Sequence, residues 1–481
     1  MRTISLLIII LLNSIHSIAQ APSNHSFFTV KANGTTLETT VFKDVNYASF
    51  KQRTALNIEI TCSETIRDFV ISPLNKQITG SLTKPNTLAF QLKEASYLVI
   101  TINKNQRLFL FAETTEDQDL SGQMANINSY HLDMEKINTG IIQTAINQAA
   151  QKKQTLFFPS GVYKTGKLSI PSNSRILMAA GAVWKASDEL SDLKNQTTQK
   201  PNAFIRIQDA NHVEIKGLGV IDGNGRALRD KYGDDARFRI FLIVSSKDVL
   251  IEGITARDPG SWNTQIMYSD NVTFKKVKLL NDVTLSNTDG FDPDASSHVT
   301  IENCFAYTGD DNVAIKVTKN DGPVNRTSDI TVKGCVFLTR KSSLKVGTES
   351  RGTSISNVLF EDNDVVMSDR GMALYCSDGA LYQNIRYVNN RFESNYPDAK
   401  KMGIQFVINK RNADSKAGKM ENVSITNCKF YTPFPAASEI KGLDDAHQIA
   451  VKIDNLEING KKCLTLSDAA IKTTFATVEV K

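Results

Sequence analysis

The sequence predicts an all-β protein in which a long parallel β-helix follows a small antiparallel β-sandwich. Two observations support this prediction. A short strand-like phrase returns many times after residue 211, and no helical pattern separates its copies. The region from residue 22 to about 122 lacks the phrase and shows short alternating runs divided by turn residues. At 481 residues the chain is long enough for both parts.

The repeated phrase alternates apolar and polar residues and closes on Gly, Asn, Asp or Lys, as in Val213–Gly217. Its copies begin 23 to 38 residues apart, at Val213, Val249, Val272, Val299, Ile330, Val358, Ile385 and Val423. Alternation that ends in a turn residue is typical of a short strand. One such strand per repeat indicates a solenoid of stacked coils. Equivalent positions of successive coils then form columns, with about 4.8 Å between one member of a column and the next.

One of these columns follows the phrase directly. Its members are Ile254, Val277, Cys304, Cys335, Asn363, Asn390 and Cys428. Cys304 and Cys335 are therefore expected to be stacked neighbours inside the solenoid, and we expect buried thiols in preference to a disulfide. Six cysteines in a chain of this length do not form a disulfide framework.

A solenoid needs covers at both ends, because its end coils expose apolar side chains and unpaired strand edges. Residues Ile141–Ala150 have apolar residues at helical spacing and predict an amphipathic cap at the first coil. At the other end, Ile449–Leu456, Ile458–Lys461 and Thr474–Val480 are expected to be short closing strands. We place the β-helix domain at residues 130–481.

Residues 22–122 predict a separate antiparallel β-sandwich, because short alternating runs such as Leu88–Leu92 and Tyr97–Ile102 are separated by turn residues. The stretch Thr114–Ser129 is rich in Asp, Gln, Asn and Ser, and we interpret it as the linker to the β-helix.

The first 19 residues predict a secretory signal peptide, with Arg2 followed by the apolar run Ile4–Leu12 and cleavage after Ala19. We therefore expect a secreted or periplasmic protein. No other stretch approaches 18 apolar residues, so no membrane span is expected. The 56 basic and 51 acidic residues leave a net charge of only +5 without long single-sign runs, which argues against a nucleic-acid partner. We expect a monomer.

The most unusual stretch, Ser286–Val317, is rich in carboxylates. Asp289 and the pair Asp310 and Asp311 lie on either side of the phrase at Val299, so stacking brings them together from consecutive coils. Crowded carboxylates have separated pKa values, and glycoside hydrolysis needs one carboxyl that keeps its proton and one that stays ionised. Solvated turns or a calcium site are the alternatives.

The motifs Asn287–Gly290 and Gly309–Asp311 resemble the signature of glycoside hydrolase family 28, the polygalacturonases. The resemblance runs from about Ile141 to the C-terminus and includes Ile221–Gly225, Pro259–Trp262 and Ile301–Cys304. It implies a right-handed parallel β-helix and an inverting hydrolysis of a pectin-related polysaccharide. Neither a cofactor nor a metal is expected.

The resemblance also implies roles for individual residues. Asp310 is expected to protonate the glycosidic oxygen, while Asp289 and Asp311 hold and deprotonate the attacking water, with about 6.5–9.5 Å between the acid and the base pair. The residues expected to contact substrate are Asn287, Asp292, Lys316, Lys341, Lys345, Arg370, Tyr375 and Trp262. Trp262 and Tyr375 are candidates for sugar stacking.

Two departures from the family pattern affect the substrate. Arg340–Ser342 stands where polygalacturonases have Gly-His-Gly, so the histidine is missing and Lys341 takes its place. Ala373–Tyr375 replaces the Arg-Ile-Lys that holds a substrate carboxylate. We therefore expect smooth polygalacturonate to be a poor substrate unless Lys316, Lys341, Lys345 or Arg370 compensates.

The predicted sandwich, placed before a β-helix with three aspartates and no histidine, also resembles glycoside hydrolase family 49, which contains dextranases. This resemblance makes a neutral α-glucan the second substrate candidate. Two other classes stay open: a polysaccharide lyase that uses Lys341 or Lys345 as the base, and a carbohydrate-binding β-helix without catalysis.

Overall fold

The computed structural model describes residues 27–114, 123–194, 202–319, 321–395 and 402–481. The expected signal peptide and the expected boundary near residue 122 lie outside these residues. The chain divides into two compact units. The first comprises Met1–Ile71 and Ile78–Thr115, and the second comprises Ser72–Gln77 and Glu116–Lys481.

The first unit contains two five-stranded sheets. The strands of the first sheet, in order, are β2 (Thr35–Leu37), β1 (Phe28–Ala32), β5 (Leu56–Cys62), β8 (Thr87–Leu92) and β7 (Gly80–Lys84). The strands of the second sheet, in order, are β3 (Thr40–Phe42), β4 (Val45–Gln52), β10 (Gln106–Thr114), β9 (Tyr97–Ile102) and β6 (Phe69–Ser72). Inward residues such as Ile58, Ile60, Leu108 and Leu110 are fully buried. The sheets are antiparallel as predicted, except that β4 and β10 run parallel.

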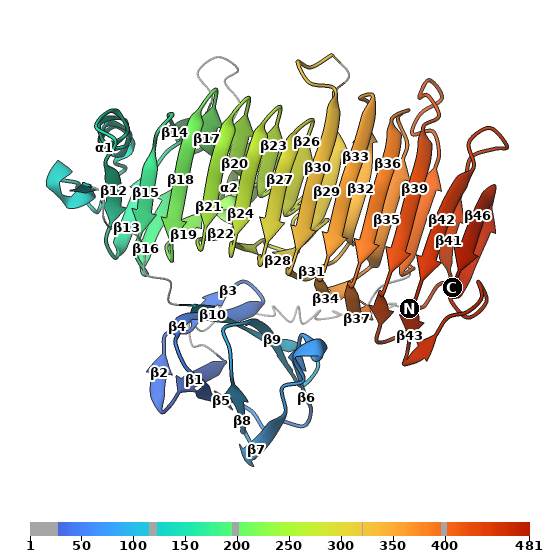
Figure 1. Cartoon of the computed structure of the whole chain (residues 1–481). Helices are drawn as coiled ribbons and strands as arrows, with labels where there is room; N and C mark the ends of the chain where they lie inside the picture. Colours follow the sequence, from blue (N-terminus) through green and yellow to red (C-terminus); the bar gives the residue numbers. More distant parts are fainter. Residues whose placement is uncertain (1–26, 115–122, 195–201, 320, 396–401) are drawn as a thin grey trace, which may run out of the picture. The chain divides into compact units, whose positions relative to one another are not determined.

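The second unit is a right-handed parallel β-helix built from three long sheets of 13, 12 and 11 strands (Figure 1). The 13-stranded sheet runs from β11 (Met124–Asn126) to β46 (Ala476–Val480), and the 12-stranded sheet runs from β13 (Gly161–Thr165) to β44 (Lys461–Lys462). All eight predicted phrases lie in the 13-stranded sheet, where the first residue of each pairs with the first residue of the next. The predicted solenoid is confirmed.

The interior of the solenoid is a stack of buried columns, and the column after the phrase is confirmed. The Cys304 amide donates a hydrogen bond to Cys335 Sγ at 3.4 Å, and the Asn363 side-chain amide donates one to Asn390 Oδ1 at 2.9 Å. All six cysteines are free and buried. The expectation of thiols in preference to a disulfide is therefore confirmed.

Both ends of the solenoid are covered as predicted. Helix α1 (Thr139–Gln151) buries Ile142, Ala145 and Ile146 against the first coil. Strands β42 (Ile449–Asp454) and β46 close the other end. No helix of the described residues is long and apolar enough to cross a membrane.

The expectation of no helix between phrases is wrong at α2 (Gly225–Tyr232). This helix lies between β19 (Val220–Asp222) and β20 (Arg239–Val244). Only Gly225 and Leu228 of its residues are buried. An apolar stripe of two residues is too short to appear as a helical period in the sequence.

The 11-stranded sheet matters for function, because the carboxylate cluster lies along one of its edges. Its strands, in order, are β14 (Leu168–Ile170), β17 (Ala203–Gln208), β20, β23 (Thr264–Met267), β26 (Phe291–Asp294), β29 (Val313–Val317), β32 (Ser342–Ser350), β35 (Arg370–Cys376), β38 (Ile404–Ile408), β41 (Ser438–Lys441) and β45 (Ile471–Thr474). Since these strands are parallel and in register, the residues that precede or begin them line up along one edge.

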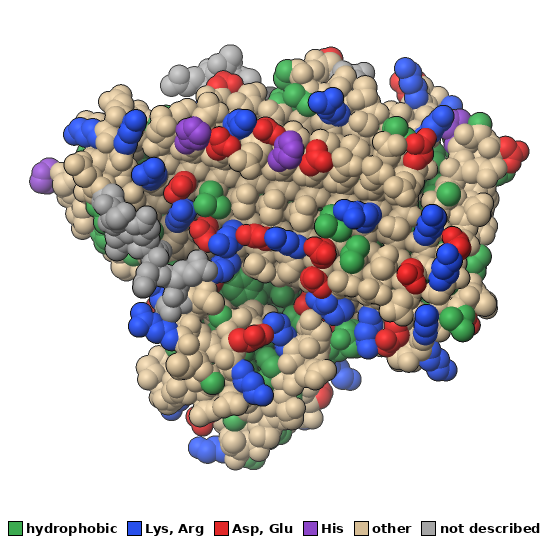
Figure 2. Space-filling view, in the orientation of Figure 1, with side chains coloured by type: hydrophobic (Ala, Val, Ile, Leu, Met, Phe, Trp, Pro, Cys, Tyr) green, Lys and Arg blue, Asp and Glu red, His purple; other side chains and the backbone are tan. Residues whose placement is uncertain are grey.

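Basic and acidic side chains interleave on the face shown in Figure 2. They do not gather into a large patch of one sign in this view. This distribution agrees with the small net charge and gives no support to a nucleic-acid partner.

Candidate active site

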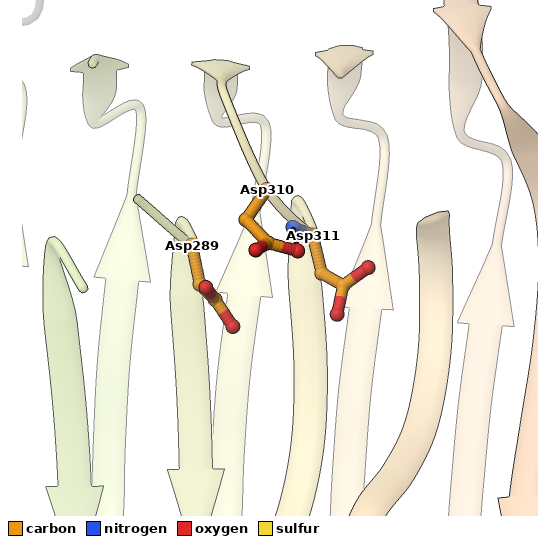
Figure 3. A group of neighbouring side chains, drawn as sticks. All are labelled: Asp289, Asp310 and Asp311. Atoms are coloured by element: carbon orange, nitrogen blue, oxygen red, sulfur yellow. Dashed lines mark hydrogen bonds between the residues drawn. The ribbon is translucent and has the colours of Figure 1, made fainter. Parts of the chain in front are cut away.

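The three predicted aspartates meet at the edge where β26 and β29 begin (Figure 3). Asp289 precedes β26, and Asp310 and Asp311 lie between β28 (Phe305–Thr308) and β29. One carboxylate oxygen from each lies within 4.8 Å of those from the other two. This limit joins single oxygens, whereas the 6.5–9.5 Å that the family resemblance implied separates whole carboxyl groups, so that separation stays a prediction.

Hydrogen bonds between the two coils position the aspartates. The Gly290 amide donates to the Asp311 carbonyl at 2.8 Å, and the buried Asn281 amide donates to the Asp289 carbonyl at 3.0 Å. A Cβ atom at Gly290 would lie only 2.4 Å from the Asn312 carbonyl oxygen. The Asp-Gly pair of the motif is therefore required by the close approach of consecutive coils.

Asp310 is the aspartate with a raised pKa in a half-buried position. Burial raises the pKa of its carboxyl to about 7, with further contributions from the charges of Asp311 and Asp289. The Asp311 amide donates to Asp310 Oδ1 at 3.0 Å. Because this pKa lies well above the ordinary value of an aspartate, the carboxyl can carry a proton near neutral pH and transfer it.

Asp311 has the opposite character. Burial alone disfavours its ionised form, but the Lys345 ammonium and its hydrogen bond lower the pKa of Asp311 below the ordinary value. Lys345 Nζ donates to Oδ2 at 2.6 Å, and the Ser342 amide donates to Oδ1 at 2.9 Å. Both oxygens are thus held in place, and the side chain is an anion at neutral pH.

Asp289 shares the ammonium of Lys316 with two other carboxylates. Lys316 Nζ lies 3.1 Å from Asp289 Oδ2, 2.8 Å from Asp292 Oδ1 and 3.7 Å from Glu349 Oε2. Burial raises the pKa of Asp289 and of Asp292, while Lys316 opposes the rise. Asp289 Oδ1 is buried and has no hydrogen-bond partner among the described residues. A water molecule is the natural donor for such an oxygen.

The chemistry of the cluster fits a metal poorly. The three aspartates are close enough to hold an ion. However, ammonium groups already contact Asp289 Oδ2 and Asp311 Oδ2. A divalent cation would have to displace both lysines or lie beside their charges.

Of the other residues predicted to contact substrate, two lie near the aspartates and two are exposed. Arg370 and Tyr375 lie near the aspartates on β35, with the Arg370 guanidinium 5.8 Å from the Tyr375 ring centre. Asn287 and Lys341 are exposed. The carbonyls of these two residues accept hydrogen bonds from the Ser261 hydroxyl and from the Asp369 and Arg370 amides, respectively.

Trp262 lies beside the cluster, but two positively charged side chains lie against its ring. Lys316 Nζ lies 3.6 Å from the ring centre, and the Arg239 guanidinium carbon lies 4.9 Å away. An ammonium this close covers one ring face, so a sugar has at most the other face for stacking.

Sequence reasoning missed several charged residues around the cluster. Arg239 begins β20, Glu349 contacts Lys316 from β32, and Arg411 pairs with Glu349 and Asp378. These residues lie on other coils than the aspartates and have no motif of their own. Only the coil register brings them to the site.

The comparisons with known proteins agree with the geometry. A sequence profile of Glycosyl hydrolases family 28 matches residues 148–470. A probable polygalacturonase of Vitis vinifera is 26% identical over 267 residues. That match covers 50% of this chain and 54% of the relative, so the chain spans about half the length of that protein.

Solved structures share the fold. An exopolygalacturonase from Thermotoga maritima superposes with a TM-score of 0.60 at 19% identity, covering 72% of this chain and 94% of that chain. Dex49A from Penicillium minioluteum superposes with a TM-score of 0.62 at 12% identity, covering 90% of this chain and 83% of that chain.

Replacing Lys316 by Met is expected to destabilise the protein by about 3–5 kcal/mol near pH 8, because two buried carboxylates lose their shared counter-charge. The pKa values of Asp289 and Asp292 then rise further, so the folded variant binds more protons than the unfolded chain and regains stability as the pH falls. Thermal midpoints of variant and parent across pH measure this difference.

Lys333→Met is the matched control. Lys333 pairs with Glu302 at 3.1 Å in a partly exposed position, so its loss should change the midpoint little. A Lys316→Met deficit that is the same at low and high pH would contradict the assigned electrostatics.

Proposed function

Since the chain belongs to Glycosyl hydrolases family 28, we propose that it hydrolyses glycosidic bonds of a pectin-related polysaccharide. The observation that carries this proposal is the pairing of one carboxyl with a pKa of about 7, Asp310, with a neighbouring carboxylate whose pKa is lowered, Asp311. Glycoside hydrolysis needs an acid and a base in these two states at the same pH.

In the proposed reaction Asp310 transfers its proton to the glycosidic oxygen as the bond from that oxygen to the anomeric carbon breaks. A water held by Asp289 and Asp311 attacks the anomeric carbon and passes a proton to one of these carboxylates. The unpartnered Asp289 Oδ1 supports this role for water, since it lacks a donor among the described residues.

We propose that the reaction inverts the anomeric configuration. The short spacing of the aspartates does not favour inversion over retention by itself. The support comes from Asp311, whose two oxygens are engaged by the Ser342 amide and by Lys345. A carboxylate held in this way is better placed to orient a water than to form a covalent bond to sugar.

The remaining expectations complete the proposal. Export through the signal peptide at residues 1–19 would bring the enzyme to an extracellular polymer, and one copy of the chain contains the whole cluster. A dextranase-like α-glucan hydrolase is the second candidate. The likeness to Dex49A shows the fold alone and covers 90% of this chain, so this candidate stays open.

Replacing Asp310 by Asn is expected to lower kcat by about 10²–10⁴-fold, because the amide has no proton to give to the leaving oxygen. Asp311→Asn should cause a loss of similar size, because the attacking water loses its base. Reducing-end release measures both.

Asp329→Asn is the control, since Asp329 lies on the 13-stranded sheet near His298 and its replacement should leave kcat unchanged. Full activity of Asp310→Asn would exclude its role as the acid.

The activity should fall as the pH rises above about 7, because the acid Asp310 then loses its proton. For a single essential acid, kcat falls tenfold per pH unit on this limb. A pH–rate profile from about pH 4 to 9 tests this expectation, and Asp310→Asn should lose the limb. A profile that stays flat to pH 9 would rule out Asp310 as the titrating group.

Product analysis separates the proposed function from its alternatives. A hydrolase releases new reducing ends without near-ultraviolet absorbance, a lyase forms unsaturated ends that absorb there, and a binding protein does neither. Polygalacturonate, rhamnogalacturonan, dextran and sulfated galactans form the panel. Proton NMR of the first product anomer should show inversion, and the retained anomer would overturn that part of the proposal.

A further inference from the structure

The outward face of the 11-stranded sheet carries a row of residues that continues away from the aspartates. In register order, this row contains Lys345 of β32, Ala373 of β35, Gln405 of β38 and Glu439 of β41. The residues that follow them on their strands, such as Leu374 and Phe406, are fully buried in the core. Because side chains alternate along a strand, the row faces outward, and Gln405 lies about 10 Å from Lys345 along the solenoid.

The Tyr375 side chain takes the space that the small Ala373 leaves in this row. Tyr375 follows Ala373 by two residues on β35, so the two share a face of the sheet. The Tyr375 hydroxyl donates a hydrogen bond to Gln405 Oε1, and Lys345 Nζ lies 5.5 Å from the ring centre. Ala373 is fully buried although its position faces outward. The partly exposed ring therefore lies across Ala373, where it can pack against a sugar ring.

Gln405 and Glu439 add hydrogen-bonding groups to the row beyond this ring. Gln405 Nε2 donates to Glu439 Oε2 at 3.2 Å. One N–H of the Gln405 amide and Oε1 of Glu439 then have no partner among the described residues. Both side chains are partly exposed. An amide N–H donates and a carboxylate oxygen accepts, and a sugar hydroxyl can meet either need.

The charge at this end of the row is negative. Glu439 forms no ion pair within the described part of the chain, and Lys472, which follows it in the register, is exposed. Lys345 is engaged by Asp311 at 2.6 Å, and Arg370 begins β35 at the edge that holds the aspartates. A sugar carboxylate placed beside Glu439 would therefore meet a like charge, which disfavours its binding.

We propose that Tyr375, Gln405 and Glu439 form a subsite for a neutral sugar residue of the substrate, and that Glu439 determines this specificity. The inference rests on the proposed function for the position of the cleaved bond, and the subsite lies beyond that bond on the β35 side. The Tyr375 ring packs against the sugar ring, the Gln405 amide donates to one hydroxyl, and the Glu439 carboxylate accepts from another. A uronate in the same place would bring its carboxylate towards Glu439.

Binding to the Asp310→Asn protein tests the inference with little turnover. The probes are oligogalacturonate and the same oligomer with its carboxylates reduced to primary alcohols, so that the two differ only in the acidic groups. Calorimetric titrations give the dissociation constant of each. In the Asp310→Asn protein, Glu439→Gln keeps the shape and removes the charge, so the ratio of the oligogalacturonate constant to that of the reduced oligomer should fall about tenfold. Tyr375→Ala should weaken binding of the reduced oligomer about tenfold.

Glu421→Gln is the matched control, because Glu421 is an exposed glutamate of β39 (Lys419–Thr426) in the 13-stranded sheet. It should leave both dissociation constants unchanged, Glu439→Asp should keep the ratio of the parent, and thermal midpoints should show that all variants fold. A ratio that Glu439→Gln leaves unchanged, or no measurable binding of the reduced oligomer to the Asp310→Asn protein, would overturn the inference. If the parent cleaves none of the polymers yet the ratio shifts, the proposed hydrolysis fails and the subsite stands.

Discussion

The in-register hydrogen bonding of successive coils is the constraint on which the rest of this structure depends. Each coil pairs with the next through parallel strands, so residues 23 to 38 positions apart in the sequence become neighbours. The same register stacks Cys304 on Cys335 in the interior and Asp289 beside Asp311 at the edge of the 11-stranded sheet. Core packing and the carboxylate cluster therefore have one physical origin. A slip of one residue would turn inward side chains outward and would separate the aspartates.

Burial makes charge the decisive property of the site. Carboxylates packed this closely cannot all ionise in a site that excludes water unless cations balance them. Lys345 stabilises the anion of Asp311, and Lys316 offsets the burial of Asp289 and Asp292. Asp310 has no ammonium within ion-pair distance among the described residues, and its pKa rises to about 7. Lys345 thus keeps Asp311 ionised beside a carboxyl that keeps its proton, and this difference between Asp311 and Asp310 supports the proposed base and acid roles.

The contacts of Lys316 and Lys345 also bear on which basic residues could bind an anionic group of the substrate. On the sequence alone they are candidates to replace the basic residues that the family motif lacks. In the structure they are committed to the aspartates, so they balance protein charge and have little left for a sugar anion. Arg239 and Arg370 lie further along the same edge, Arg239 against the Trp262 ring and Arg370 on the Ser342 hydroxyl.

The sequence by itself determined the architecture and the three aspartates, because both are periodic or local signals. Alternating phrases with turn residues predict stacked coils, and Asn287–Gly290 with Gly309–Asp311 marks the cluster. The parallel pairing of β4 with β10 and helix α2 were not predictable from the sequence. Only the tertiary structure decided which lysine pairs with which carboxylate, that cations occupy the Trp262 ring, and that Arg239 belongs to the site. These properties depend on contacts between coils, and no local pattern in the sequence records which side chains meet there.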